Sequence, residues 1–476
     1  MHILFTNTVV QWIGAALSRS IGLVLTLVLT RSLGSDQFGK YTLIYTFLSF
    51  FTLLASFGLQ TIAARDAVQN PQNTPVIFGD LIVLTALFAI LSSGACIITA
   101  RLFSYGDDIL YGMKIASLSI LLIPICSSSL LFQINFKMHH TIISSLIRDM
   151  SLLILACYLW HTKSGYIGYV CGTVFASILS AAYIITVGRS ILKPRFTFAL
   201  DRYWAFIRAS LPLAISGIAL YIYNYIDSIM ISKMSTASML AFYSIAYKFV
   251  FLGQEIPKAI LTSVFPLLAH SATADKSLSL GYFQRSFDTI TLAGMFICVI
   301  GILYGEKLIV LLFGSGYQTA FIPFAIFCVN FIFMFPNMLL SQYMISIGSQ
   351  KIVLLFMSTV AIINIIINIF VIPLYGIAGA ALATMASEIT FCALSFIFLR
   401  VRDRFRIDFT PAIKMFSVSA VLIVIGHNMV MPVALHCAIV ALLFVISTYY
   451  LRAYDYGSVY NLLIKTQYRD KGYLFR

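Results

Sequence analysis

Long apolar runs separated by short polar loops recur along the whole chain. Each run is about 20 residues long, the length at which a helix crosses the bilayer core with its backbone hydrogen bonds satisfied internally. The pattern predicts fourteen spans, at residues 8–30, 41–63, 78–100, 109–134, 141–161, 165–188, 210–233, 238–268, 283–304, 320–348, 352–372, 377–399, 412–431 and 433–450.

Composition agrees with this pattern. The chain is 60% hydrophobic and 10% charged, with a mean hydropathy of +0.96. A soluble domain cannot bury that much apolar surface. The sequence therefore predicts an all-α polytopic membrane protein.

The net charge of +14 is unevenly distributed. If the N-terminus is inside, 21 of the 31 Lys and Arg residues belong to inside loops, 7 to outside loops and 3 to spans. Cytoplasmic loops of membrane proteins are enriched in Lys and Arg. We therefore interpret the charge as a topology signal rather than a nucleic-acid surface, and predict that both termini are cytoplasmic.

The chain contains a weak internal repeat. FGKYTLIYTF (38–47) matches LAFYSIAYKF (240–249), and the glycine pair 165/168 is echoed by 376/379. Pro124 and Pro336 correspond within the fourth and tenth spans. A duplication of six spans gives two copies of the same orientation, related by an axis along the membrane normal, with a substrate path at their interface.

These features predict four regions. Residues 1–193 form an N-terminal six-helix bundle, and residues 194–209 form a cytoplasmic linker with an interfacial helix carrying Tyr203 and Trp204 at headgroup depth. Residues 210–403 form a second six-helix bundle. Residues 404–476 add two further spanning helices and a cytoplasmic tail.

Several function classes lack their signatures. The outside loops are short, and the chain has no Walker A, HExxH or GxSxG motif. The eight cysteines lie in apolar spans without a CxxC pair. Asp107 and Asp108 could imitate an enzymatic acid pair, although a solvated turn is the simpler interpretation. We predict that the chain is not an enzyme and holds neither a metal nor a cofactor.

Charges inside the spans are the candidate site, because ionisable groups are rare in a membrane and usually face a cavity or a partner. The eighth span is richest: Lys248 and Glu255 are seven residues apart on one helix face, and Lys258 follows Glu255 by three. The full set is Arg19, Asp227, Lys248, Glu255, Lys258, Asp288 and Glu388.

Two interpretations of this set remain open. In the functional one, Arg19, Lys248 and Lys258 hold an anionic head group, while Asp227 and Glu255 bind a coupling H⁺ or Na⁺ or tune the lysines. In the structural one, the acids pair internally and the lysines reach toward the interface. The structural interpretation is favoured for Asp288 and Glu388, which we place near span ends.

Several strings resemble a known family: LTRSLGSDQFGKYTL (29–43), DSIMISKMSTASMLAFYSIAYKF (227–249), FPLLAH (265–270), LIVLLFGSGYQTA (308–320) and INIIINIFVIPLYGIAGAALATMASE (363–388). Over residues 1–400, in this order, the chain resembles the polysaccharide transporters, the O-antigen and capsule repeat-unit flippases (Wzx-type) of the multidrug/oligosaccharidyl-lipid/polysaccharide (MOP) exporter superfamily.

The resemblance implies a MATE-like fold of two six-helix bundles in pseudo-twofold relation around a central cavity. It implies a substrate of undecaprenyl-pyrophosphate-linked oligosaccharide, flipped from the cytoplasmic to the periplasmic leaflet of the bacterial inner membrane by alternating access. Family cavities are cationic, a role that Arg19, Lys248 and Lys258 would fill here. The polymerase and chain-length regulator of the same pathway are the expected protein partners.

Three alternatives stay open. One is a flippase for another polyprenyl-linked glycan such as lipid II, whose branch of the superfamily has fourteen spans. A second is a cation-coupled drug exporter of the same superfamily, against which the three basic residues argue. The third is a membrane glycosyltransferase or polymerase, against which the short outer loops argue.

Overall fold

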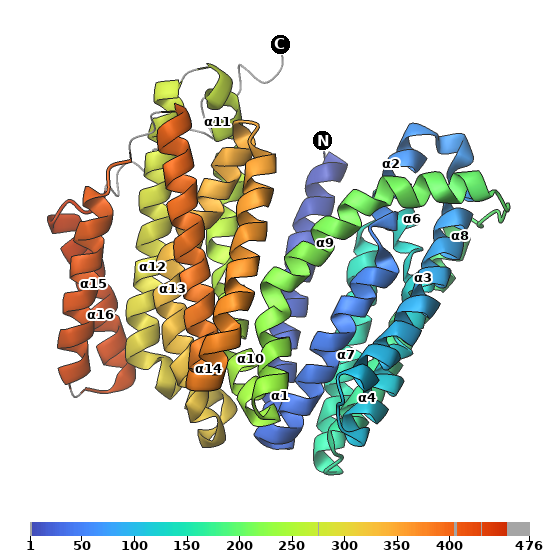
Figure 1. The fold of residues 1–476 in the computed structure, drawn as a ribbon, viewed down its shortest axis with the longest axis horizontal. Helices are drawn as coiled ribbons and strands as arrows, with labels where there is room; N and C mark the ends of the chain where they lie inside the picture. Colours follow the sequence, from blue (N-terminus) through green and yellow to red (C-terminus); the bar gives the residue numbers. More distant parts are fainter. Residues whose placement is uncertain (1, 275, 404–406, 430, 455–476) are drawn as a thin grey trace. The chain divides into compact units, whose positions relative to one another are not determined.

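A computed structural model describes residues 2–274, 276–403, 407–429 and 431–454, and every regular element in these ranges is helical. The prediction of an all-α chain is therefore confirmed (Figure 1). The chain divides into two compact units, Met1–Ala241 (unit 1) and Phe242–Arg476 (unit 2).

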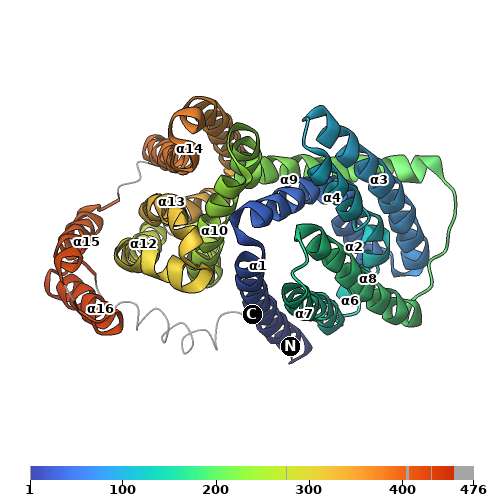
Figure 2. The same cartoon turned by 90° about the horizontal axis from the view of Figure 1, so that it is seen from below.

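Unit 1 contains the helices of the first seven predicted spans. They are α1 (His2–Ser56), α2 (Leu59–Gln69), α3 (Thr74–Leu102), α4 (Asp107–Ser117), α5 (Ile123–Cys126), α6 (Ser129–Ile134), α7 (His139–His161), α8 (Tyr166–Ile191) and α9 (Leu200–Met234). Figure 2 shows this group end-on, with α7 beside both α1 and α8.

Helix α10 (Ala237–Gly253) begins at the end of unit 1 and continues into unit 2. The remaining helices of unit 2 are α11 (Glu255–Ala274), α12 (Lys276–Phe313), α13 (Phe321–Ser346), α14 (Gln350–Asp403), α15 (Thr410–Asn428) and α16 (Val433–Tyr450). The last two pack on α12 around Met295, Val299 and Phe444.

Eleven helical segments in the described ranges are long and apolar enough to cross a membrane, including both α15 and α16. Two of these segments contain two predicted spans each, because α1 bends at Gly34 and α14 bends at Gly376. Both glycines have positive φ, 69° and 57°, which only a residue without a Cβ adopts readily. The chain therefore reverses at these points without a separate loop.

The predicted span 238–268 is a pair of helices with a break at Gln254. Pro257 has no N–H to donate to the carbonyl of Gly253, so the helical ladder loses one hydrogen bond there. The bonds on either side persist, from Gln254 N to Val250 O at 3.0 Å and from Lys258 N to Gln254 O at 3.2 Å. The two arms, α10 and α11, therefore remain joined through a kink.

The linker between α8 and α9 is fixed to the start of α3. Arg195 N donates to Pro75 O at 2.8 Å, and a Cβ at Gly79 would lie 2.3 Å from Arg195 O. Arg202 donates from Nε and Nη2 to the carboxylate of Asp80 at 2.5 and 3.1 Å, and from Nη2 also to Thr197 O.

The predicted interfacial helix and the seventh span are one continuous helix, α9. Tyr203 is buried in the core of unit 1, where it belongs to a cluster with Leu59 and Phe78, whereas Trp204 is exposed. The two rings, predicted together at headgroup depth, therefore face different surroundings.

The packing units divide at Ala241, whereas the repeat predicts a duplication boundary at residue 210. Packing and ancestry are different properties, and α9 packs on α1 and α2 of unit 1. The four predicted regions stay predictions.

Candidate functional site

In unit 2, the kinked pair α10 and α11 carries three of the predicted site residues. Lys258 Nζ lies 3.1 Å from Glu255 Oε1, with the two side chains 50% and 34% exposed. This contact spans three residues within one helical turn, as the spacing allows. The structure therefore brings Glu255 and Lys258 together as an ion pair accessible from outside the core.

Lys248 lies half-buried on α10, next to a cluster of rings. The adjacent Tyr247 stacks on Tyr243, with ring centroids 5.8 Å apart, and both rings make edge contacts with Phe327 of α13. These rings fix the orientation of α10. Lys248 is therefore presented from a rigid helix face.

The turn between Lys248 and Glu255 is also held by α13. A Cβ on Gly253 would lie 2.7 Å from the ring of Phe331, and Gln254 Nε2 lies 3.6 Å from Met334 Sδ. The kink therefore packs directly on α13, which limits the residues that can replace Gly253.

In unit 1, Arg19 is an exposed residue of α1. The polar residues of the first predicted span do not all lie at the surface. Gln11 and Arg19 are exposed, whereas Thr26 is buried and donates to Gly22 O at 2.8 Å.

Asp227, the other predicted site residue of unit 1, is buried in α9 at 5% exposure. Tyrosines anchor this part of α9 to α1. The Tyr221 hydroxyl contacts Thr46 O and Ser49 Oγ, and its ring stacks on Tyr225 at 4.7 Å. The predicted set is thus distributed over both units, with Arg19 and Asp227 in unit 1 and Lys248, Glu255 and Lys258 in unit 2.

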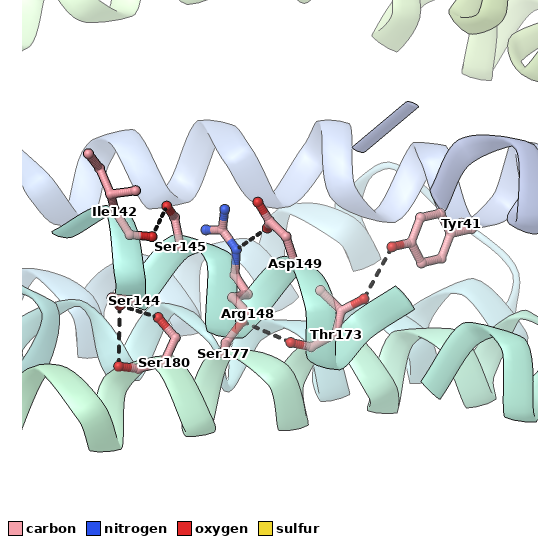
Figure 3. A network of polar contacts seen from close by, with 9 residues as sticks. All are labelled: Tyr41, Ile142, Ser144, Ser145, Arg148, Asp149, Thr173, Ser177 and Ser180. Carbon is pink, nitrogen blue, oxygen red and sulfur yellow. Dashed lines mark hydrogen bonds and ion pairs between the residues drawn. The ribbon is translucent and has the colours of Figure 1, made fainter. Parts of the chain in front are cut away.

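An ion pair that the apolar pattern does not predict lies in the middle of the predicted span 141–161. Arg148 Nε lies 3.0 Å from Asp149 Oδ1, at the centre of the 23-residue helix α7 (Figure 3). Arg148 is one of the 21 basic residues that the charge distribution assigns to inside loops. The sequence carries a signal for this ion pair, because Arg148 and Asp149 both interrupt the apolar run 141–161.

Arg148 lies at about the same depth in unit 1 as Arg19. Gly14 of α1 contacts Ile142 of α7, and the Tyr169 hydroxyl contacts both Ser32 of α1 and Ala156 of α7, so these helices run parallel. With a rise of 1.5 Å per residue, the two arginines lie about 8 and 9 Å beyond the Gly14 contact.

Hydroxyl groups in the same part of unit 1 make hydrogen bonds to one another. Ser144 Oγ lies 2.7 Å from Ser180 Oγ, and Thr173 Oγ1 lies 3.1 Å from the Tyr41 hydroxyl. In Figure 3, Arg148 and Asp149 extend from α7 away from α8. Arg148 is 49% exposed, whereas Ser144 and Ser180 are buried. These polar groups therefore extend from the core of unit 1 to its surface, an arrangement that hydropathy alone does not predict.

The two acids interpreted as structural do make internal hydrogen bonds. Glu388 is buried, and Asn337 Nδ2 donates to its carboxylate at 2.6 Å. Its position near the centre of the second arm of α14, rather than near an end, differs from our expectation. Asp288 accepts from Gln284 Nε2 at 2.9 Å.

Gln284 also reaches the connection before α15. Its amide donates to Asp408 O and accepts from Asp408 N. Hydrogen bonds from the side chain and backbone of Thr410 hold the pKa of the Asp408 carboxyl below its usual value. This connection is therefore tied to the start of α12.

Comparisons with known proteins agree on a family and a fold. Residues 4–272 match the family described as "Polysaccharide biosynthesis protein". A Shigella flexneri protein named "Putative O-antigen transporter" is 26% identical over 222 residues, 45% of this chain. The match spans about half, 51%, of that relative.

Solved structures of MOP transporters have the same fold. The lipid II flippase MurJ in an inward closed conformation matches 94% of this chain and 98% of its own, with a TM-score of 0.76 and 17% identity. An inward-facing MATE family multidrug transporter matches 80% of this chain and 93% of its own, with a TM-score of 0.64 and 11% identity. At such identities the similarity establishes the fold, as predicted.

Proposed function

Because the chain belongs to the polysaccharide biosynthesis protein family, we propose that it is a flippase for undecaprenyl-pyrophosphate-linked oligosaccharide repeat units of O-antigen or capsule. The family match over residues 4–272 carries this proposal. The chain is a multi-pass membrane protein whose family and fold are those of transporters rather than enzymes. We place it in the bacterial inner membrane with both termini cytoplasmic.

The physics of the substrate favours alternating access. A sugar head group cannot cross about 30 Å of hydrocarbon unaided, whereas the lipid tail can stay in the bilayer throughout. A membrane potential that is negative inside drives a pyrophosphate outward by about 2.3 kcal/mol per charge per 100 mV. Flipping therefore needs no ATP-hydrolysing site on this chain.

Within this proposal, Arg19, Lys248 and Lys258 bind the anionic head group. The Glu255 carboxylate then neutralises Lys258 in the absence of substrate, and the pyrophosphate displaces it when the substrate binds. Asp227 and Glu255 are the proposed sites of H⁺ or Na⁺ coupling. The polymerase and chain-length regulator of the pathway are the proposed partners.

The first experiment measures polyprenyl-linked intermediates by mass spectrometry in cells that lack the gene but retain the glycan assembly enzymes. We expect one undecaprenyl-pyrophosphate oligosaccharide to accumulate while surface polymer is lost, and expect the wild-type gene to restore both. An unchanged lipid-linked pool with intact surface glycan would rule out the proposal.

Site roles are tested by complementation in the same cells. Lys248→Gln and Lys258→Gln should each reduce surface polymer, whereas Lys114→Gln, an exposed lysine of α4, should not. Glu255→Gln tests coupling, and normal flipping by this variant would remove Glu255 from the coupling role. Immunoblots of membranes verify that each variant is present in equal amount.

A lipid II flippase is the second candidate. It is favoured by the similarity to the MurJ structure, which covers 94% of this chain and therefore extends beyond the first twelve predicted spans. The same mass spectrometry separates the two candidates, since accumulation of lipid II in place of an oligosaccharide would support this one.

A further inference from the structure

An apolar pocket lies inside unit 1, between α3, α5, α8 and the linker 192–199. Its volume is about 290 Å³. Most of its lining is hydrocarbon: Phe78, Ile82, Pro124, Ile125, Ile185 and Leu192. The pocket is near the size of small ligand sites, and its lining suits a flexible apolar chain better than a polar ligand.

The linker that forms one wall of the pocket is held rigidly. The backbone N–H of Arg195 donates a hydrogen bond to the carbonyl of Pro75, and Gly79 allows α3 to approach the linker backbone closely. Arg202, just beyond the linker, is held by both oxygens of Asp80. The pocket is therefore a fixed feature of the fold and not a chance gap beside a loose segment.

The edge of the pocket is cationic. Arg189 lines it directly and is exposed, and Lys193 and Arg195 are exposed on the adjoining linker. Asp80, the acid nearest along α3, is already paired with Arg202. The charge around the opening therefore complements an anion.

Exposed rings flank the same opening. Phe196 lines the pocket and is 59% exposed, and Phe198 is 86% exposed. Large exposed apolar side chains beside basic residues are typical of a segment at the membrane interface. Figure 1 shows the linker joining α8 to the start of α9 at one end of unit 1.

We propose that this pocket binds an anionic phospholipid, with one acyl chain between α3, α5 and α8 and the phosphate held by Arg189, Lys193 and Arg195. Basic residues at a membrane surface attract anionic lipids, and an apolar pocket beneath them adds a place for the chain. This lipid is a resident ligand, distinct from the transported glycan, so the inference does not depend on the proposed function.

The test uses the full-length protein in nanodiscs that contain equal amounts of phosphatidylglycerol and phosphatidylcholine, followed by native mass spectrometry. We expect one retained phosphatidylglycerol, favoured over phosphatidylcholine by at least about tenfold. Equal retention of the two lipids would overturn the proposal, because the bound lipid would then be ordinary annular lipid.

Two variants separate the head-group and chain contacts. The triple variant R189Q/K193Q/R195Q should lose the preference for phosphatidylglycerol. Its matched control, R101Q/K114Q/K163Q, makes the same charge change at exposed positions away from the pocket and should keep the preference. A triple variant that kept the preference would contradict the assigned phosphate contacts.

Ile185→Trp fills the pocket and should abolish retention of the lipid. Ile178→Trp, at an exposed position of the same helix, should not. Continued retention by Ile185→Trp would contradict the acyl-chain site. Should Ile185→Trp fail to fold, as judged by circular dichroism, the charge variant still decides the proposal because its substitutions lie at exposed positions.

Discussion

The two copies of the internal repeat use corresponding tyrosines differently. In unit 1, the rings of Tyr41 and Tyr45 are 4.7 Å apart and their hydroxyls reach Thr173 Oγ1 and Val170 O of α8, at 3.1 and 3.4 Å. In unit 2, Tyr243 and Tyr247 stack at 5.8 Å and both contact the ring of Phe327.

The difference shows how one sequence pattern supports two kinds of helix contact. Thr173 already donates its hydroxyl hydrogen to Tyr169 O, so Tyr41 is the donor in the contact between them. In unit 2 the corresponding tyrosines pack their rings against an aromatic side chain, Phe327 of α13. The same tyrosine spacing therefore meets a threonine hydroxyl and a backbone carbonyl of α8 in unit 1, and an aromatic ring of α13 in unit 2.

The largest expected effect tests the ring packing of Tyr243 in unit 2. Tyr243→Ala removes a fully buried ring from unit 2 and should lower the free energy of unfolding by about 3 kcal/mol, the lower end of the range for large aromatic truncations. Unfolding in SDS titrations measures this change. Tyr375→Ala, at an exposed position of α14, is the control and should change little.

The next prediction tests whether a polar contact in unit 1 contributes as much stability as the aromatic packing in unit 2. Arg202→Gln leaves the Asp80 carboxylate, 1% exposed, without its cation and should destabilise the protein by about 3 kcal/mol. The double variant Asp80→Asn/Arg202→Gln should recover part of this loss, because no unpaired buried charge remains. Equal or greater destabilisation of the double variant would contradict the explanation.

A smaller effect is expected for the neutral hydrogen bond between Tyr41 and Thr173 in unit 1. A double-mutant cycle with Tyr41→Phe and Thr173→Val should give a coupling energy of about 0.6 kcal/mol, the average for hydrogen bonds inside membrane proteins. The cycle is needed because Thr173→Val also removes the bond to Tyr169. Zero coupling would show that the Tyr41 hydroxyl does not stabilise unit 1.

The smallest effect concerns an exposed contact close to the same repeat. Lys40 Nζ lies 3.0 Å from Asp108 Oδ2, with the side chains 27% and 50% exposed. Lys40→Gln should cost at most about 0.5 kcal/mol, and the difference should shrink in high salt. A larger loss, insensitive to salt, would indicate that this contact is shielded from solvent.

Much of the fold was predictable from the sequence because membrane spans are specified by length and hydropathy. Every predicted span has a helical counterpart, including the last two at α15 and α16. The reversals at Gly34 and Gly376 required tertiary information, since glycine occurs in many conformations. The kink at Gln254 had a local signal in Pro257 that the apolar pattern concealed.

The candidate site was less predictable, because pairing depends on which helix faces meet. The spacing of Glu255 and Lys258 allowed either an ion pair or two separate roles, and the structure places them in contact. Arg148 was assigned to a loop by charge counting, although it lies at the centre of α7. Similarly, nothing in the linker sequence separated the buried Tyr203 from the exposed Trp204.

The proline kink between α10 and α11 sets the geometry of the proposed binding surface. The ladder already lacks the bond from residue 257 to Gly253, so bending about Gln254 deforms the helix at its softest point. Lys248 lies on one arm and Lys258 on the other. The spacing between the two ammonium groups therefore depends on the angle of this kink, which the packing of Gly253 and Gln254 on α13 holds.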